Sequence, residues 1–142
     1  ILITGAGGMF GGVLRSSGIG DALADVLTDL GIPIILAGFI IAVIMRVAQG
    51  SATVALTTAA GLIAPAVMAA ELGGLQVAAL VVAVAAGSVA LSHVNDSGFW
   101  LVGRFLEMDV RTTFRTWTVL ETIIAVVGFL IAAAVYGLAG LL

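Results

Sequence analysis

The sequence predicts an all-α, polytopic membrane protein, and three observations support this fold class. Hydrophobic residues make up 62% of the 142 residues and charged residues only 9%, whereas charged residues are about 25% of ordinary soluble domains. The mean hydropathy is +1.31. Between Leu72 and Asn95 there is no Asp, Glu, Lys or Arg, as is typical of a helix that crosses a bilayer.

The composition also excludes several classes of function. The net charge of −3 is small and lysine is absent, so no nucleic-acid partner is expected. Cysteine is absent too, and with a single histidine, His93, a multi-histidine metal site is excluded. We therefore expect no metal and no cofactor. Because the sequence starts at Ile1, inside an apolar run, we interpret it as the C-terminal part of a longer polytopic protein.

The first two elements differ in character. Residues 1–14 are apolar and rich in glycine, which indicates the end of a spanning helix whose backbone approaches a neighbour closely. Residues 16–30 predict an amphipathic helix on the membrane surface. Asp21, Asp25 and Asp29 recur every four residues on one face, and apolar residues form the opposite face.

Residues 32–70 predict a re-entrant helical hairpin. Only 16 residues, 32–47, precede a polar turn at Gln49, Gly50 and Ser51. A helix of this length is about 24 Å long, less than the ~30 Å hydrocarbon core. The chain is therefore expected to turn back before it reaches the other side. Two full spans with a short turn remain an open alternative, because both arrangements return the chain to the same side.

Residues 75–103 predict the next span, broken by polar residues at 92–98. Asn, Asp, Ser and Gly disfavour helix, and non-helical backbone at membrane depth is tolerated only where it lines protein or water. Residues 116–142 predict the terminal helix. Three arginines lie between these spans and predict a cytoplasmic connector and an extracytoplasmic C-terminus: Arg104, Arg111 and Arg115. We expect Glu121 at the cytoplasmic interface, paired with Arg111 or Arg115.

Two broken elements are typical of secondary transporters, in which half-helix N-termini point at an anionic substrate. The predicted substrate-binding residues are Arg46, Gln49, Gly50, Ser51, Thr53, Ser92, Asn95, Ser97 and Gly98. Asp96 and His93 are the predicted carriers of the coupling proton, because burial shifts the protonation of both residue types. Two roles remain open for Arg46, which either neutralises a substrate carboxylate or pairs with Asp96. Ser51 and Thr53 either contact the substrate or only cap a helix.

Three segments carry a resemblance to a known family: GAGGMFGGVLRSSGIGDAL, RVAQGSATVALTTAAGL and SHVNDSGFWLVGRFLEMDVRTTFRTWTVLET. They resemble the gluconate permease (GntP) family of bacterial proton symporters, within the ion-transporter superfamily. The resemblance implies a C-terminal inverted-repeat half, in which a Ser-x-Thr hairpin tip meets an unwound helix at the substrate. These elements correspond here to Ser51-Ala52-Thr53 and to 92–98. Ala52 stands where dicarboxylate relatives carry Asn, which favours proton coupling over sodium coupling.

The function that the resemblance implies is proton-coupled uptake of gluconate or a related sugar acid across the bacterial inner membrane, not enzymatic catalysis. D-serine or another small organic anion is the alternative substrate. Two other classes are weighed against it, an intramembrane hydrolase that uses a serine with His93 and a noncatalytic membrane subunit. The expected partners are the sugar-acid anion, the proton, the bilayer and the missing N-terminal repeat, with a homodimer left open.

Overall fold

The computed structural model describes Met9, Val13, Ser17 and residues 31–141, and this part of the chain is built from helices without a strand. The predicted all-α fold class is confirmed. Apart from those first three positions, the elements predicted for residues 1–14 and 16–30 lie outside the described residues.

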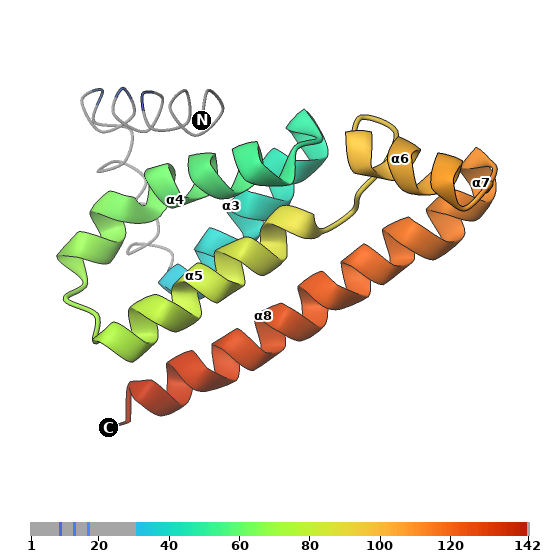
Figure 1. Cartoon of the computed structure of the whole chain (residues 1–142). Helices are drawn as coiled ribbons and strands as arrows, with labels where there is room; N and C mark the ends of the chain where they lie inside the picture. The colour runs from blue at the N-terminus through green and yellow to red at the C-terminus, as the bar shows by residue number, and fades with distance from the viewer. Residues whose placement is uncertain (1–8, 10–12, 14–16, 18–30, 142) are drawn as a thin grey trace.

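The first two described helices form a hairpin. Helix α3 (Ile34–Gln49) and helix α4 (Ala52–Ala69) lie side by side (Figure 1), joined by Gly50 and Ser51. Gly50 ends α3 with a φ of 74°, and its N–H donates to the Arg46 carbonyl oxygen. Ser51 begins α4, because its Oγ accepts a hydrogen bond from the Val54 N–H at 3.4 Å. Residues 32–70 thus fold as a helical hairpin; its re-entrant position in a bilayer stays a prediction.

The next span is broken, as its polar residues suggested. Helix α5 (Gly74–Val89) ends well before helix α6 (Ser97–Phe105) begins, and residues 90–96 between them are not helical. We call residues 90–96 the break. It ends earlier than the predicted 92–98, because Asp96 Oδ1 accepts a hydrogen bond from the Gly98 N–H at 2.9 Å and so caps α6.

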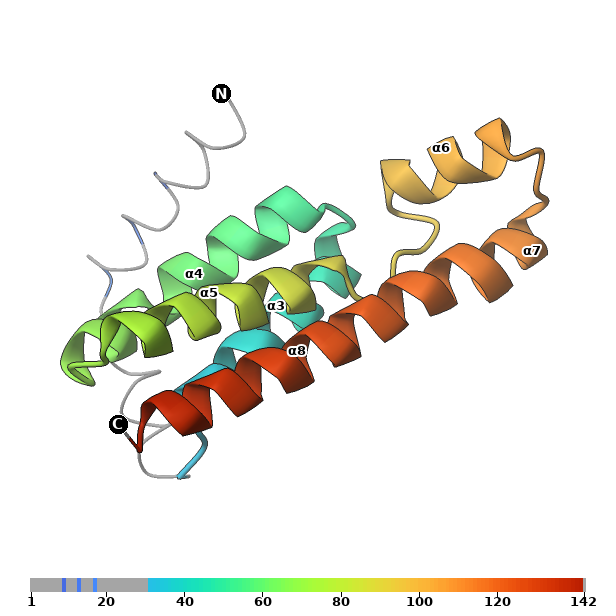
Figure 2. The same ribbon diagram turned by 60° about the horizontal axis from the view of Figure 1, so that its bottom comes forward.

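The terminal helix is longer than predicted. Helix α7 (Val110–Thr113), the π-helical turn η1 (Phe114–Thr118) and helix α8 (Val119–Ala139) follow one another without interruption. The helix begins at Val110 rather than at residue 116 because Asp109 Oδ1 accepts a hydrogen bond from the Thr112 N–H at 3.0 Å. In both views α8 runs back along α5 in the opposite direction (Figures 1 and 2).

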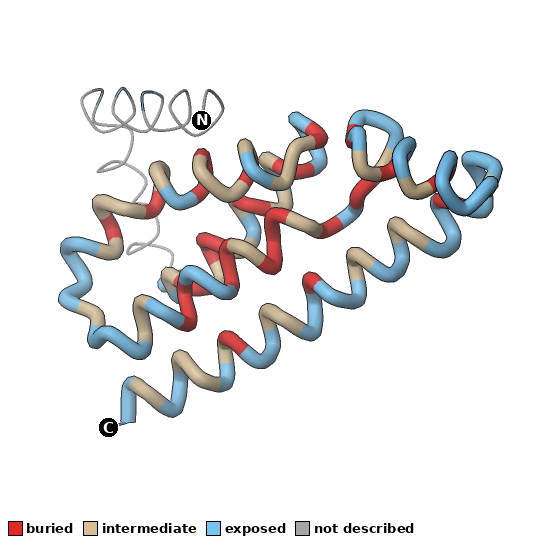
Figure 3. The backbone as a smooth tube through the Cα atoms, in the orientation of Figure 1, coloured by how far each residue is buried: buried red, intermediate tan, exposed pale blue. Residues whose placement is uncertain are grey.

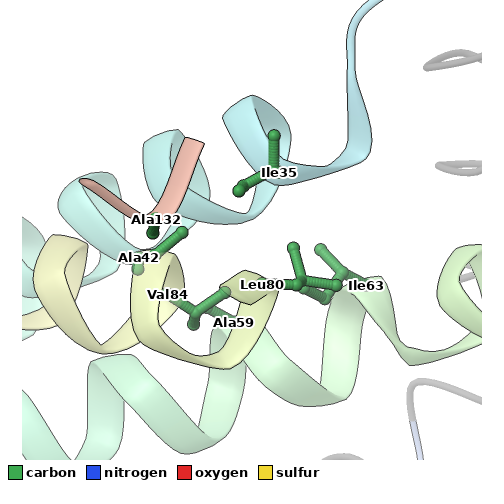
Figure 4. Close-up of a cluster of buried hydrophobic side chains, with 8 residues drawn as sticks. Ile35, Ala42, Ala59, Ile63, Leu80, Val84 and Ala132 are labelled. Atoms are coloured by element: carbon green, nitrogen blue, oxygen red, sulfur yellow. The ribbon is translucent and has the colours of Figure 1, made fainter. Parts of the chain in front are cut away.

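Helix α5 is at the centre of the packing, in contact with α3, α4 and α8. The buried core takes side chains from all four helices (Figure 4): Ile35, Ala42, Ala59, Ile63, Leu80, Ala83, Val84 and Ala132. Close approach of α3 and α5 requires a glycine, because a Cβ on Gly87 would lie 2.6 Å from the Phe39 carbonyl oxygen. The rings of Phe39 and Phe129 are 4.3 Å apart and join α3 to α8.

The outward faces are apolar. Much of α8 is exposed (Figure 3), and its exposed side chains include Ile123, Ile124, Val127, Leu130 and Ile131. By length and composition, two helical stretches could cross a membrane, Ala52–Ala69 and Val110–Ala139, whereas α3 and α5 are apolar but shorter. A helix surface of this kind suits contact with lipid.

Candidate functional site

The tip of the hairpin and the break touch each other. A Cβ on Gly50 would lie 2.3 Å from the Asn95 carbonyl oxygen, so the two backbones are in direct contact. The Asn95 Nδ2 amide donates a hydrogen bond to the Val47 carbonyl oxygen at 2.9 Å. The structure therefore brings together the two polar segments that were predicted to form one site.

Arg46 connects the same two segments from inside. Only 3% of this residue is exposed. Its Nη1 donates to the Gly50 carbonyl oxygen and its Nη2 to Asp96 Oδ2, each at 2.5 Å. The structure shows the ion pair with Asp96, which is one of the two roles left open for Arg46. Among the described residues, Arg46 Nε is the only buried side-chain nitrogen or oxygen without a hydrogen-bond partner.

Asp96 has both carboxylate oxygens occupied. Oδ2 accepts from Arg46 and also from the Ser92 hydroxyl at 2.5 Å. Oδ1 accepts from the Gly98 N–H at the start of α6. Ser92 is itself buried, with 1% of its surface exposed. This carboxylate is a structural centre, because it holds α3, the break and the first turn of α6 at one point.

The π-helical turn η1 and helix α8 contribute residues that the sequence analysis missed. Trp117 Nε1 donates to Ser92 Oγ at 2.9 Å, and the Thr118 hydroxyl donates to the Ser92 carbonyl oxygen. Thr122 Oγ1 accepts from the Leu91 N–H at 3.4 Å. The available signal was the i, i+4 spacing of Thr118 and Thr122, which sets two polar side chains on adjacent turns of one helix face. The π-helical turn adds to this, since such turns are frequent at functional sites.

Several other predicted residues lie around this meeting point, and of these only Asn95 makes a hydrogen bond across it. Gln49, Thr53 and Ser97 are exposed, and their side chains make no hydrogen bond within the described part of the chain. Ser51 is half-buried and caps α4. Asn95 is exposed although its amide is bound. The site therefore has a buried polar set, Arg46, Ser92 and Asp96, and a more accessible set, Gln49, Ser51, Thr53, Asn95 and Ser97.

His93 lies in the break but binds locally. Its Nδ1 is 2.8 Å from the Leu91 carbonyl oxygen. No serine hydroxyl within the described residues is hydrogen-bonded to this ring. A hydrolase would need a nucleophile within reach of its base, so the geometry does not favour the hydrolase alternative.

Glu121 does not behave as predicted. Within the described part of the chain its carboxylate forms no ion pair with Arg111 or Arg115, so the expected pairing is wrong. Glu121 is half-buried and lies within electrostatic range of Arg46 and Asp96 instead. The reason is its position on the helix face that packs inward, whereas Arg111 and Arg115 are exposed.

Comparison with known proteins gives a match along almost the whole chain. The family model described as GntP family permease matches residues 1–138. The low-affinity gluconate transporter of Escherichia coli K12 is 45% identical over 138 residues, which cover 97% of this chain and 31% of that protein. The gluconate permease of Pseudomonas aeruginosa is 45% identical over 128 residues, covering 90% of this chain and 28% of that protein.

A third relative is the gluconate permease of Bacillus subtilis, 42% identical over 128 residues, or 90% of this chain and 28% of that protein. The chain thus spans about a third of the length of the curated relatives it matches. No solved structure matches the chain.

Proposed function

We propose, since this chain belongs to the GntP family of permeases, that it is part of a secondary transporter that takes up gluconate or a closely related sugar acid. The family resemblance expected from the sequence is confirmed. Membership of this family supports a multi-pass membrane transporter rather than an enzyme. The chain covers about a third of its relatives, so the activity proposed is that of the whole permease.

The contact between the hairpin tip and the break supports this proposal. Helix α4 begins beside Gly50, and helix α6 begins directly after Asp96. The first N–H groups of a helix have no partner within it, and its N-terminus carries a partial positive charge. Two such ends at one point suit a carboxylate. Hydroxyl and amide groups nearby suit the hydroxyls of a sugar acid, because they both donate and accept hydrogen bonds.

We assign different tasks to the two sets of residues. Arg46 and Asp96 are buried and bound to each other, so they hold the tip against the break rather than contact the substrate. The accessible side chains would take the substrate, with Ser51 and Thr53 near its carboxylate and Asn95 near its hydroxyls. Gln49 and Ser97 flank them on either side.

Labelled gluconate uptake by the full-length permease in proteoliposomes tests this proposal. Ser51→Asp keeps a good helix cap but adds a negative charge where the substrate carboxylate would bind, whereas Ser51→Asn keeps the cap without the charge. We expect Ser51→Asp to abolish uptake and Ser51→Asn to retain part of it. Ser88→Ala is the matched control, because Ser88 bonds only to the Ala85 carbonyl oxygen of its own helix. Equal uptake by both Ser51 variants would contradict the assignment.

Proton coupling and the identity of the anion belong to the same proposal. Uptake should rise with an inward proton gradient and fall when an uncoupler is added. Unlabelled D-serine and other small organic anions, added as competitors, would rank the alternative substrates. If wild-type permease takes up labelled gluconate equally well without a gradient, proton symport is excluded.

The bacterial inner membrane is the proposed location, with the C-terminus outside. Arg104 in α6, Arg111 in α7 and Arg115 in η1 are exposed. Helices α6 and α7 lie together at one end of the described structure (Figure 1), and positively charged connectors stay in the cytoplasm. A cysteine introduced at Leu141 should then react with a membrane-impermeant thiol reagent in intact cells. A cysteine at Arg111 should react only after the membrane is opened.

A further inference from the structure

We propose that Glu121 carries the coupling proton of this permease, an inference that rests on the proposed function as a proton symporter. The proton is taken up by the Glu121 carboxylate when the anion binds and is given up when the anion leaves. Arg46 and Asp96 stay charged and keep the tip joined to the break throughout.

The position of Glu121 on α8 is the first observation. Ala125 and Ala132 are the buried residues of α8. Gly128 faces α5, because a Cβ on Gly128 would lie 3.1 Å from the Ala86 Cβ. Glu121 is four residues before Ala125 and seven before Gly128, so it lies on this same inward face. It is the charged member of a stripe of otherwise small residues that packs against α5.

The second observation is the position of Glu121 along the axis of the helix bundle, opposite the break. Thr118 at the end of η1 and Thr122 in the first turn of α8 hydrogen-bond to the break at Ser92 and Leu91. Glu121 lies between these two threonines in the sequence, so its own turn stands opposite the break. Its carboxylate is accordingly within electrostatic range of both Arg46 and Asp96.

The packing of α3 against α8 agrees with this level. Phe39 and Phe129 pair their rings between the two helices. Arg46 is seven residues after Phe39, and Glu121 is eight before Phe129. The two helices run in opposite directions, so both residues lie on the same side of the ring pair, about two helical turns away from it. Arg46 and Glu121 are therefore at the same level along the bundle.

The hydrogen bonds distinguish Glu121 from the carboxylate predicted to carry the proton. Asp96 accepts from Arg46, Ser92 and Gly98, and a proton on it would displace one of these donors. The Glu121 carboxylate accepts no hydrogen bond within the described residues, and it forms no ion pair there. Glu121 can therefore gain a proton without the loss of a structural contact, whereas Asp96 cannot.

The charges explain why such a proton would be coupled to an anion. One guanidinium and two carboxylates leave this cluster with an excess of negative charge, which repels a sugar-acid anion. A proton on Glu121 removes the excess, so the anion binds better to the protonated protein. The other ionisable groups on the packed elements are His93 in the break and the exposed Arg115 in η1, while α5 has none.

The test compares two transport modes of the full-length permease in proteoliposomes. Glu121→Gln imitates the protonated residue and breaks no hydrogen bond seen here. We expect gradient-driven accumulation of labelled gluconate to fall about tenfold or more. A change of this size is typical when the binding of one ligand, here the proton, is coupled to the binding of another. Counterflow, the exchange of labelled for unlabelled gluconate without a gradient, should persist, and gluconate binding should lose its dependence on pH. Glu71→Gln is the matched control, because Glu71 is exposed in the connection between α4 and α5.

Two results would overturn the inference while leaving the proposed function intact. One is gradient-driven accumulation in Glu121→Gln equal to that of wild type. The other is a combined result from two variants. Glu121→Gln loses both accumulation and counterflow, and Glu121→Asp, which keeps a carboxylate, also shows no gradient-driven accumulation. This pair of results counts against the inference whether or not Glu121→Gln folds. Failure of the proposed function is a separate outcome, because wild type itself would then show no gradient-driven gluconate accumulation.

Discussion

Arg46 Nη2 and Asp96 Oδ2 lie 2.5 Å apart although 50 residues separate them in the sequence. The exposed fractions of the two side chains are 4% and 12%, so the ion pair is shielded from solvent. The contact joins the last turn of α3 to the last residue of the break, which caps α6. It is the main polar link between the hairpin tip and the break, and it makes the geometry of the candidate site depend on one buried ion pair.

Removing one of the two charges should lower the free energy of unfolding more than removing both. Asp96→Asn keeps a good cap for α6 but leaves the Arg46 charge buried and unpaired, which costs about 3–5 kcal/mol. We expect thermal unfolding of the purified full-length permease to show a large loss for Asp96→Asn and for Arg46→Gln. The double variant should lose less than the sum of the two. Additive losses in this double-mutant cycle would show that the two charges do not interact.

The contact between Gly50 and Asn95 gives a second prediction. An alanine at Gly50 meets two obstacles, a φ of 74° and the Asn95 carbonyl oxygen at 2.3 Å. Gly31 is the matched control, because its φ is 63° but no atom of the described residues lies within 4 Å of a Cβ there. We expect Gly31→Ala to cost about 1–2 kcal/mol from its backbone conformation alone. Gly50→Ala should cost about 1–3 kcal/mol more, as overpacking does.

Both variants are measured by thermal unfolding and by gluconate uptake. Gly50→Ala should also reduce uptake, since the tip must shift away from the break, whereas Gly31→Ala should transport normally. Equal effects of the two substitutions on stability and on uptake would contradict a close contact between Gly50 and Asn95.

Much of this architecture was predictable, because the bilayer restricts which segments are helical. Apolar runs interrupted by the polar turn at residues 49–51 and by the polar cluster near 92–98 already indicated a hairpin and a broken helix. The boundaries were harder, since each depends on one cap. Asp96 and Asp109 extend α6 and the terminal helix toward the N-terminus by accepting N–H bonds, and either residue could equally have belonged to a loop.

The site was predictable only in part. Arg46, Gly50, Ser92, Asn95 and Asp96 stand out as polar residues in apolar surroundings, and the structure brings them together. The contribution of η1 and α8 was not foreseen. Whether Trp117, Thr118 and Glu121 face the break depends on the rotation of the continuous terminal helix about its axis, which the π-helical turn changes. No local pattern of residues specifies that rotation.

Trp117 supplies a third prediction. Its Nε1–H donates to the Ser92 hydroxyl, which in turn donates to Asp96. Trp117→Phe keeps the aromatic packing but removes the donor, and we expect a loss of about 1 kcal/mol. Gluconate uptake should also fall, because Ser92 is then less well oriented toward Asp96. Trp100→Phe is a useful comparison, since Trp100 is exposed and donates to the Val94 carbonyl oxygen. Greater losses of stability and uptake in Trp100→Phe would argue against a central role for the contact between Trp117 and Ser92.

The N-terminal cap of the long terminal helix predicts a dependence of stability on acid. Asp109 precedes this helix, and hydrogen bonds from the Thr112 hydroxyl and then from its backbone N–H lower the pKa of the Asp109 carboxyl below its ordinary value of 3.8. The folded protein therefore holds this proton less readily than the unfolded chain. The contribution of Asp109 to stability is fully present above pH 3.8 and disappears as the pH falls through the lower pKa of the folded state.

Asp109→Asn removes the titrating group and keeps a residue that caps helices well. The comparison is the thermal unfolding temperature of wild type and Asp109→Asn at neutral pH and near pH 3. Wild type should lose stability relative to the variant as the solution becomes acidic, because only wild type has a cap that can be protonated. The other carboxyl groups are common to both proteins and cancel in the difference. A constant difference between the two proteins across this pH range would mean that Asp109 does not stabilise the helix through its charge.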